Sequence, residues 1–208
     1  MRSVIFVLML MAVGLIFTLP SFAQDKTKIV DDAFAKIKAG DTASIDFKDL
    51  RMAYVGSKYA GGEADVKLKD KLRSESKAKD FAGMAKTANE ILQTEHLNPT
   101  IYVYAATAAQ ALQDKKRAEA LTAIYVAIMN SVVGSGDGTS TKTAYVVISP
   151  NEEIAVINQF ALQKVSHEGL TEDGHSFDVV TVMDKTTNQT SKVYFNVDLV
   201  PKAAPAKP

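Results

Sequence analysis

The sequence predicts an α+β fold: antiparallel N-terminal helices packed with a small, mainly antiparallel C-terminal sheet and one short helix. Apolar residues recur at helical spacing over residues 27–133. Alternating and continuous apolar runs, typical of strands, fill residues 141–200. A loop with three glycines, residues 134–140, separates the two patterns. Because each half has an apolar side to bury, we expect a single domain over residues 24–200.

Residues 1–23 have the pattern of a signal peptide. Arg2 precedes a long apolar run, and Ser21, Phe22 and Ala23 supply the small-residue pattern that signal peptidase recognises. We therefore expect cleavage after Ala23 and export to the periplasm or the medium, with no membrane attachment afterwards. Retention of the segment as an anchor is the alternative.

The composition narrows the classes of partner. Lys plus Arg and Asp plus Glu are equal at 24 each, so the formal net charge is zero and we expect no nucleic-acid partner. The chain has no cysteine, which excludes disulfides and a lipoprotein anchor. Residues 201–208 hold three prolines among small and charged residues, and we expect a disordered tail there. The sequence does not fix the oligomeric state.

The first predicted helices are amphipathic and lie at the surface. A stripe of Val30, Ala33, Phe34 and Ile37 predicts a helix over residues 28–39 that ends at Gly40. Asp46 is the expected N-cap of a second, short helix. Residues 63–79 alternate acids and bases, which is typical of a solvated helix.

Three further helical segments are expected to pack together, over residues 81–92, 98–112 and 115–133. The last has no charge between Glu119 and Asp137 and is apolar on nearly every side, so we expect it to be the buried central helix. Ala85 and Ala118 stand 33 positions apart, close to the ~34-residue period of a tetratricopeptide repeat. A tetratricopeptide-like hairpin and ordinary antiparallel packing both remain open.

The second half is predicted to hold strands and one helix. Residues 145–148 are apolar on both faces, which suggests an inner strand. Ser149 and Glu152 have the spacing of a capping box at the start of a helix. This helix would bury either Ile154, Ile157 and Ala161 or the side with Val156 and Phe160. Residues 162–167 are a third strand candidate. Residues 177–183 and 191–197 alternate, and the polar segment between them predicts a hairpin.

The glycine loop is the first candidate site, and it contains Ser135, Gly136, Asp137 and Gly138. A phosphate-binding loop would need a strand before it and a helix after it, whereas here the order is reversed. A calcium loop would need more carboxylates than Asp137 alone. The simpler interpretation is a helix C-cap followed by a tight turn.

The second candidate is the group of His167, His175 and Asp178, near Glu168 and Asp173. This group could form an acid–base pair or a metal cage, but its members also suit solvated turns. No two histidines stand four residues apart and there is no cysteine, so we expect neither a metal nor a cofactor. Glu152 and Glu153 are adjacent, and adjacent residues on a helix do not face each other.

Residues 135–162 resemble a family of exported bacterial proteins, the domain of unknown function numbered four-nine-one-nine. Ten residues carry the resemblance: Ser135, Gly136, Asp137, Gly138, Ala144, Tyr145, Val147, Ile148, Ser149 and Glu153. Ile154 stands where the family pattern has an aromatic residue. The resemblance implies a signal peptide, a helical front half and a following strand, and it implies no active residue.

Two functional hypotheses follow. The first is a non-enzymatic binding or interaction module of the cell envelope, whose alanine-rich helices form a groove for a peptide or protein partner. The alternative is a hydrolase-like enzyme that uses the loop at residues 134–140 with His167, His175 or Asp178.

Overall fold

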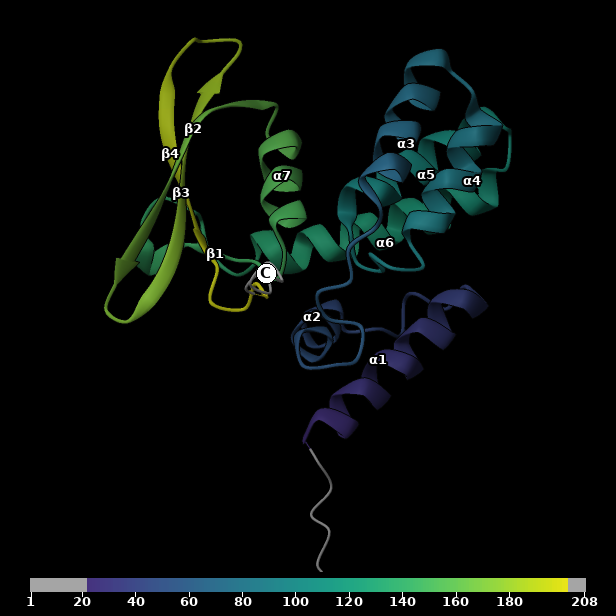
Figure 1. The fold of residues 1–208 in the computed structure, drawn as a ribbon, viewed down its shortest axis with the longest axis horizontal. Helices are drawn as coiled ribbons and strands as arrows, with labels where there is room; N and C mark the ends of the chain where they lie inside the picture. Colours follow the sequence, from purple (N-terminus) through teal and green to yellow (C-terminus); the bar gives the residue numbers. More distant parts are fainter. Residues whose placement is uncertain (1–21, 202–208) are drawn as a thin grey trace, which may run out of the picture.

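The computed structural model describes residues 22–201 (Figure 1). The predicted signal peptide therefore lies outside the described residues except for Phe22 and Ala23, and the predicted tail lies outside them except for Pro201. The helical half consists of α1 (Phe22–Ala39), α2 (Phe47–Val55), α3 (Val66–Ala78), α4 (Phe81–Ile91), α5 (Pro99–Ala111) and α6 (Lys115–Val133). Within the described range, no helix has the length and apolarity needed to cross a membrane.

The starts of α2 to α6 are fixed by side-chain caps. The carboxylate of Asp46 accepts hydrogen bonds from the amides of Lys48 and Asp49, which confirms the predicted cap of α2. The side chain of Asn98 accepts from the amide of Thr100 at the start of α5. Such caps satisfy amides of the first helical turn that have no partner within the helix. Because the capping residue stands only two or three positions before those amides, the caps can be predicted from the sequence.

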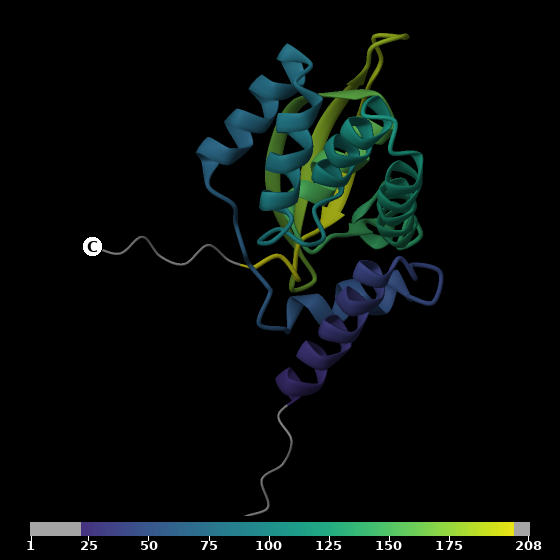
Figure 2. The same ribbon diagram turned by 90° about the vertical axis from the view of Figure 1, so that its right-hand side faces the viewer.

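Helices α3 to α6 pack side by side, while α1 and α2 lie together at one end of the molecule (Figures 1 and 2). Two apolar clusters hold this half together. Leu72, Met84 and Ile91 lie in one cluster, and Val30, Leu50 and Ile124 lie in the other. The alternating charges of α3 are solvated as predicted, since Leu72 is its only buried residue.

The helix α6 is central, as predicted, but it is not buried on every side. Ile124 and Ile128 are buried against the N-terminal helices, and Met129 and Val132 pack with the residues of the sheet. Val126, however, is 44% exposed, and Ala123 is also exposed. The prediction of an all-round apolar environment was wrong because small and β-branched residues also occupy the solvent face of this helix.

The strand-rich half is a four-stranded mixed sheet of order β1-β4-β3-β2. Its strands are β1 (Tyr145–Val146), β2 (Leu162–Glu172), β3 (His175–Asp184) and β4 (Thr190–Asn196). The predicted hairpin is confirmed, since β3 and β4 pair antiparallel. The predicted inner strand is wrong: β1 is a two-residue edge strand, parallel to β4. Its residues are apolar because α6 and the glycine loop cover it, not because strands flank it on both sides.

Helix α7 (Pro150–Gln159) lies between the sheet and α5 (Figure 1). It buries Val156 and Ile157, whereas Ile154 and Phe160 are each 49% exposed, so neither predicted set matches its inner face. The predicted capping box does not form, because the Ser149 side chain makes no cap hydrogen bond. The carboxylate of Glu152 instead accepts from the amide of Ile148 and from the guanidinium of Arg51.

Strand β2 is longer than the predicted 162–167. It extends to Glu172, and a two-residue turn with positive φ at Asp173 and Gly174 leads into β3. Ten of its eleven residues are exposed. Because neither face of the strand is buried, the alternation of apolar and polar residues on which strand prediction depends is missing. His167 therefore lies within the predicted strand, whereas Glu168 lies in its continuation and not in a loop.

Candidate functional site

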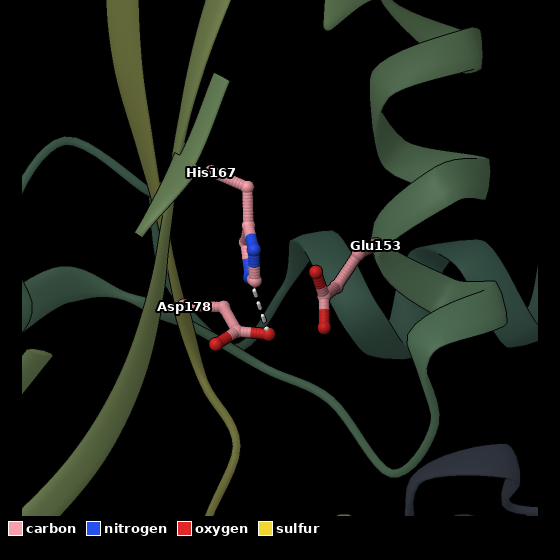
Figure 3. Close-up of side chains that lie close together, drawn as sticks. All are labelled: Glu153, His167 and Asp178. Atoms are coloured by element: carbon pink, nitrogen blue, oxygen red, sulfur yellow. Dashed lines mark ion pairs between the residues drawn. The ribbon is translucent and has the colours of Figure 1, made fainter. Parts of the chain in front are cut away.

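Helix α7 and the sheet bring together three side chains from separate elements: Glu153 from α7, His167 from β2 and Asp178 from β3. Asp178 pairs with Gly169 across the two strands, so His167 is its diagonal neighbour, two residues along β2. The side chains of His167 and Asp178 therefore leave the same face of the sheet. Figure 3 shows that Glu153 points toward them from the opposite side.

The three groups lie close enough together to be candidate ligands of one metal ion. The distance from His167 Nε2 to Asp178 Oδ2 is 3.1 Å. One ligand atom from each of the three residues lies within 4.8 Å of the other two. Glu153 is only 6% exposed, whereas the side chains of His167 and Asp178 are 41% and 28% exposed. The site is therefore buried at its α7 end, where Glu153 lies, and open to solvent at the side of His167 and Asp178.

The electrostatics of this site favour a positive charge. Burial, and to a lesser extent the neighbouring Asp178 carboxyl, raise the pKa of Glu153 to about 8, while Lys164 acts in the opposite direction. Two carboxyl groups at close range cannot both be ionised in a poorly solvated place without a cation. In the absence of a metal, a proton on Glu153 supplies that compensation near neutral pH.

The ligand types fit a transition metal. One imidazole nitrogen and two carboxylate oxygens are a donor set that zinc, manganese and iron accept, whereas calcium and magnesium prefer oxygen alone. Three protein ligands with an open side also leave a coordination position for water or for another molecule. The expectation of no metal site considered His167 and Asp178 without their third partner, Glu153.

The other predicted histidine, His175, belongs to a different pair. Its Nδ1 lies 2.6 Å from Asp198 Oδ2, and its side chain is 60% exposed. Asp198 also accepts from the amide of Ser176, so it ties the start of β3 to the segment that follows β4. The structure thus brings together His167 and Asp178 and places His175 apart from them, in a turn contact.

The glycine loop has a structural role in linking α6 to the sheet. Ser135 Oγ accepts from the amide of Val146 at 2.8 Å, and the carbonyl of Gly138 accepts from the amide of Tyr194 at 2.9 Å. The Thr143 side chain, together with the amide and hydroxyl of Thr139 that donate to the Asp137 carboxylate, holds the pKa of Asp137 below its usual value. Over residues 22–201, no hydrogen bond joins this loop to His167, His175 or Asp178.

Sequence reasoning missed Glu153 and Arg51. One signal was available for Glu153, since it precedes Val156 and Ile157 by three and four positions and so shares their buried face. Arg51 had no local signal. Its partner Glu152 stands 101 positions away, and only the packing of α2 against α6 and α7 reveals the pair.

Comparison with known proteins gives one match. A family model described as Domain of unknown function (DUF4919) matches residues 35–204. No curated protein and no solved structure matches the chain. The match covers the described domain from within α1 to its end, including the glycine loop, Glu153 and the sheet.

Proposed function

We propose a function for this chain, which belongs to the family described as Domain of unknown function (DUF4919): it is an exported binding protein that holds a divalent transition-metal ion. The ligands are Glu153, His167 and Asp178. The remaining coordination positions face solvent, where a water molecule or a partner's donor group completes the shell. The site would bind the ion and, through the open coordination positions of the ion, a further ligand such as a donor group of a partner.

One observation carries this proposal. Three side chains of metal-binding type converge from α7, β2 and β3, and the carboxyl group of Glu153 is buried and forms no ion pair among residues 22–201. A buried carboxyl beside a second carboxyl is unfavourable unless it takes up a cation. A divalent ion would replace the proton on Glu153 and satisfy all three groups together.

Zinc is the ion that the ligands favour. Imidazole binds zinc well, and zinc accepts a four-coordinate shell with one or two carboxylates. The chain has no cysteine, so the site depends on ligands that an oxidising compartment does not modify. This property agrees with export, which we propose from Arg2, the apolar run after it and the small residues before Gln24.

Zinc titration of the purified, chelator-treated protein tests the metal site. We expect one ion per chain, and Glu153→Gln should weaken zinc binding by about 10²-fold, since it removes a charged ligand but keeps its shape. His175→Gln is the matched control, because it removes the other histidine of a His–Asp pair and should leave the affinity unchanged. Equal affinity in the wild type and in Glu153→Gln would refute the proposed site.

The mass of the chain recovered from cells tests export. We expect the mature protein to begin at Gln24. A mass that includes residues 1–23 would instead identify a retained anchor, and recovery from the cytosol alone would contradict export.

A peptide or protein partner is also proposed, but the alanine-rich surface is not its groove. Ala105, Ala108 and Ala109 are buried between neighbouring helices, where their small side chains allow close packing. Any groove of the helical half therefore lies elsewhere on its surface.

A further inference from the structure

A cleft of about 680 Å³ opens between α1 and the three helices α4, α5 and α6. Its volume is in the range of small-molecule sites. The apolar part of its lining comes from both sides of the cleft and consists of Phe34, Ile37, Leu92, Leu121 and Ile124. His96 is also apolar in effect, because its ring stacks on Phe34 at 4.7 Å and burial lowers its pKa.

The charged residues of this cleft are all positive. Lys38 comes from the last turn of α1 and Arg117 from the first turn of α6, and no acidic residue of the part of the chain that the structure describes lines the cleft. Among residues 22–201, neither cation takes part in an ion pair. The Arg117 guanidinium donates one hydrogen bond to Asn89 Oδ1 at 2.8 Å and keeps its other donors. The cleft therefore combines an apolar interior with two exposed cationic side chains that have no ion-pair partner among the described residues.

A second cavity of about 710 Å³ provides a contrast. It is lined by one cation, Lys69, and by the carboxylates of Glu63 and Glu95. Lys69 Nζ lies 2.6 Å from Glu95 and 3.5 Å from Glu63, so the one cation of this cavity is already paired with carboxylates. The cations of the cleft beside α1 have no such carboxylate partner among residues 22–201 and are therefore available to an anionic ligand.

We propose that the cleft between α1 and α4–α6 binds an amphiphilic carboxylate, of the chemical class of a medium-chain fatty acid. The hydrocarbon chain would lie against Phe34, Leu92 and Leu121, where it is removed from water. The carboxylate would lie between Lys38 and Arg117, and a guanidinium binds a carboxylate through paired hydrogen bonds. A peptide fits less well, because its backbone groups need polar partners along their length and Asn89 is already engaged with Arg117.

This site is independent of the metal site, because it lies in the helical half and shares no residue with Glu153, His167 and Asp178. Binding of decanoate to the chelator-treated full chain, measured by calorimetry, therefore tests it alone. We expect saturable binding of one decanoate per chain. The double variant Lys38→Gln/Arg117→Gln should bind decanoate about tenfold more weakly or worse, while decanol binding stays unchanged.

Filling the cleft gives the second test. Ala120 lines the cleft, and Ala120→Trp should abolish the binding of both decanoate and decanol. Ala123→Trp is the matched control, since Ala123 lies on the same helix, is exposed and does not line the cleft. The proposal is overturned by undiminished decanoate binding in Ala120→Trp, by decanol binding as tight as decanoate binding in the wild type, or by no saturable binding.

Discussion

The ion pair between Arg51 and Glu152 joins the two halves of the molecule. Arg51 Nε and Nη2 donate to the Glu152 carboxylate at 2.8 and 2.7 Å, and both side chains are buried. The remaining donors reach Ser131 Oγ on α6 and the carbonyl of Val146 on β1. One side chain from α2 thus donates hydrogen bonds to oxygen atoms of α6, β1 and α7.

Arg51→Met should therefore be strongly destabilising. The substitution leaves the buried Glu152 carboxylate without its countercharge, and we expect the free energy of unfolding to fall by about 3–5 kcal/mol. Urea denaturation measures this loss. Lys28→Met is the control, because the Lys28–Asp32 pair is 75% and 62% exposed and such pairs contribute less than ~1 kcal/mol. Similar losses in the two variants would contradict a special role for the buried pair.

At the scale of single residues, the sequence identified groups that act locally. Asp46 and Asn98 bond to amides two or three positions ahead, so spacing alone revealed them. Glu152 had the same kind of local explanation as a capping-box member, yet its carboxylate bonds to Arg51 and Ile148. Long-range pairing prevailed over the local rule because a buried charge requires the strongest available partner.

The glycine loop between α6 and β1 makes a prediction at the scale of the element. Gly138 has φ +70, and a Cβ there would lie 2.4 Å from the Tyr145 ring, whereas Gly40 has φ +81 and nothing within 4 Å. Gly40→Ala should cost about 1–2 kcal/mol for the left-handed backbone alone. Gly138→Ala should cost about 1–3 kcal/mol more, because it also forces Tyr145 to move. Thermal unfolding of both variants separates the cost of the left-handed backbone, which both share, from the cost of the steric clash with Tyr145, which only Gly138→Ala has. Equal losses of stability would mean that the loop does not pack tightly against Tyr145 of β1.

The pKa of Glu153 makes α7 pH-sensitive. In the folded chain its pKa is raised to about 8, against an ordinary value of 4.5. Between these values the unfolded state has released the proton that the folded state still holds, so stability falls as pH rises through this window and falls no further above it. Below pH 4.5 both states are protonated, and the contribution of this group is fully present.

Without metal, Glu153→Gln should remove this pH dependence. Relative to the wild type, we expect the variant to gain stability between pH 5 and pH 9, on the order of 3 kcal/mol, measured by urea denaturation with a chelator present. Glu168→Gln is the control on β2. The pKa of Glu168 is lowered by Lys192, so its contribution is lost at acid pH, the opposite direction. If the stability of the wild type and that of Glu153→Gln changed with pH in parallel, the buried Glu153 carboxyl would not be the cause of the pH dependence.

At the scale of the whole molecule, the α+β class and the order of elements were predictable, because periodicity changes once, at the glycine loop. The order of the sheet was not. The short strand β1 pairs in parallel with β4 because of where the chain leaves the end of α6 relative to the sheet. No local sequence pattern encodes that position. The candidate site was half visible for the same reason: His167 and Asp178 share a hairpin, whereas Glu153 reaches them only after α7 docks on the sheet.

The distribution of ligands over the fold makes the last prediction. All three proposed metal ligands belong to the strand-rich half, on α7, β2 and β3. An ion that binds only the folded state stabilises it by about 2.7 kcal/mol at a free concentration of 100 times its Kd. We therefore expect zinc to raise the Tm of the wild type and to slow amide hydrogen exchange in α7, β2 and β3 more than in α3 and α4. At the same zinc concentration Glu153→Gln should show much smaller effects, because its site lacks one of two carboxylates and its affinity is expected to be about 10²-fold lower. If zinc raised the Tm of that variant as much as that of the wild type, the ion would bind elsewhere.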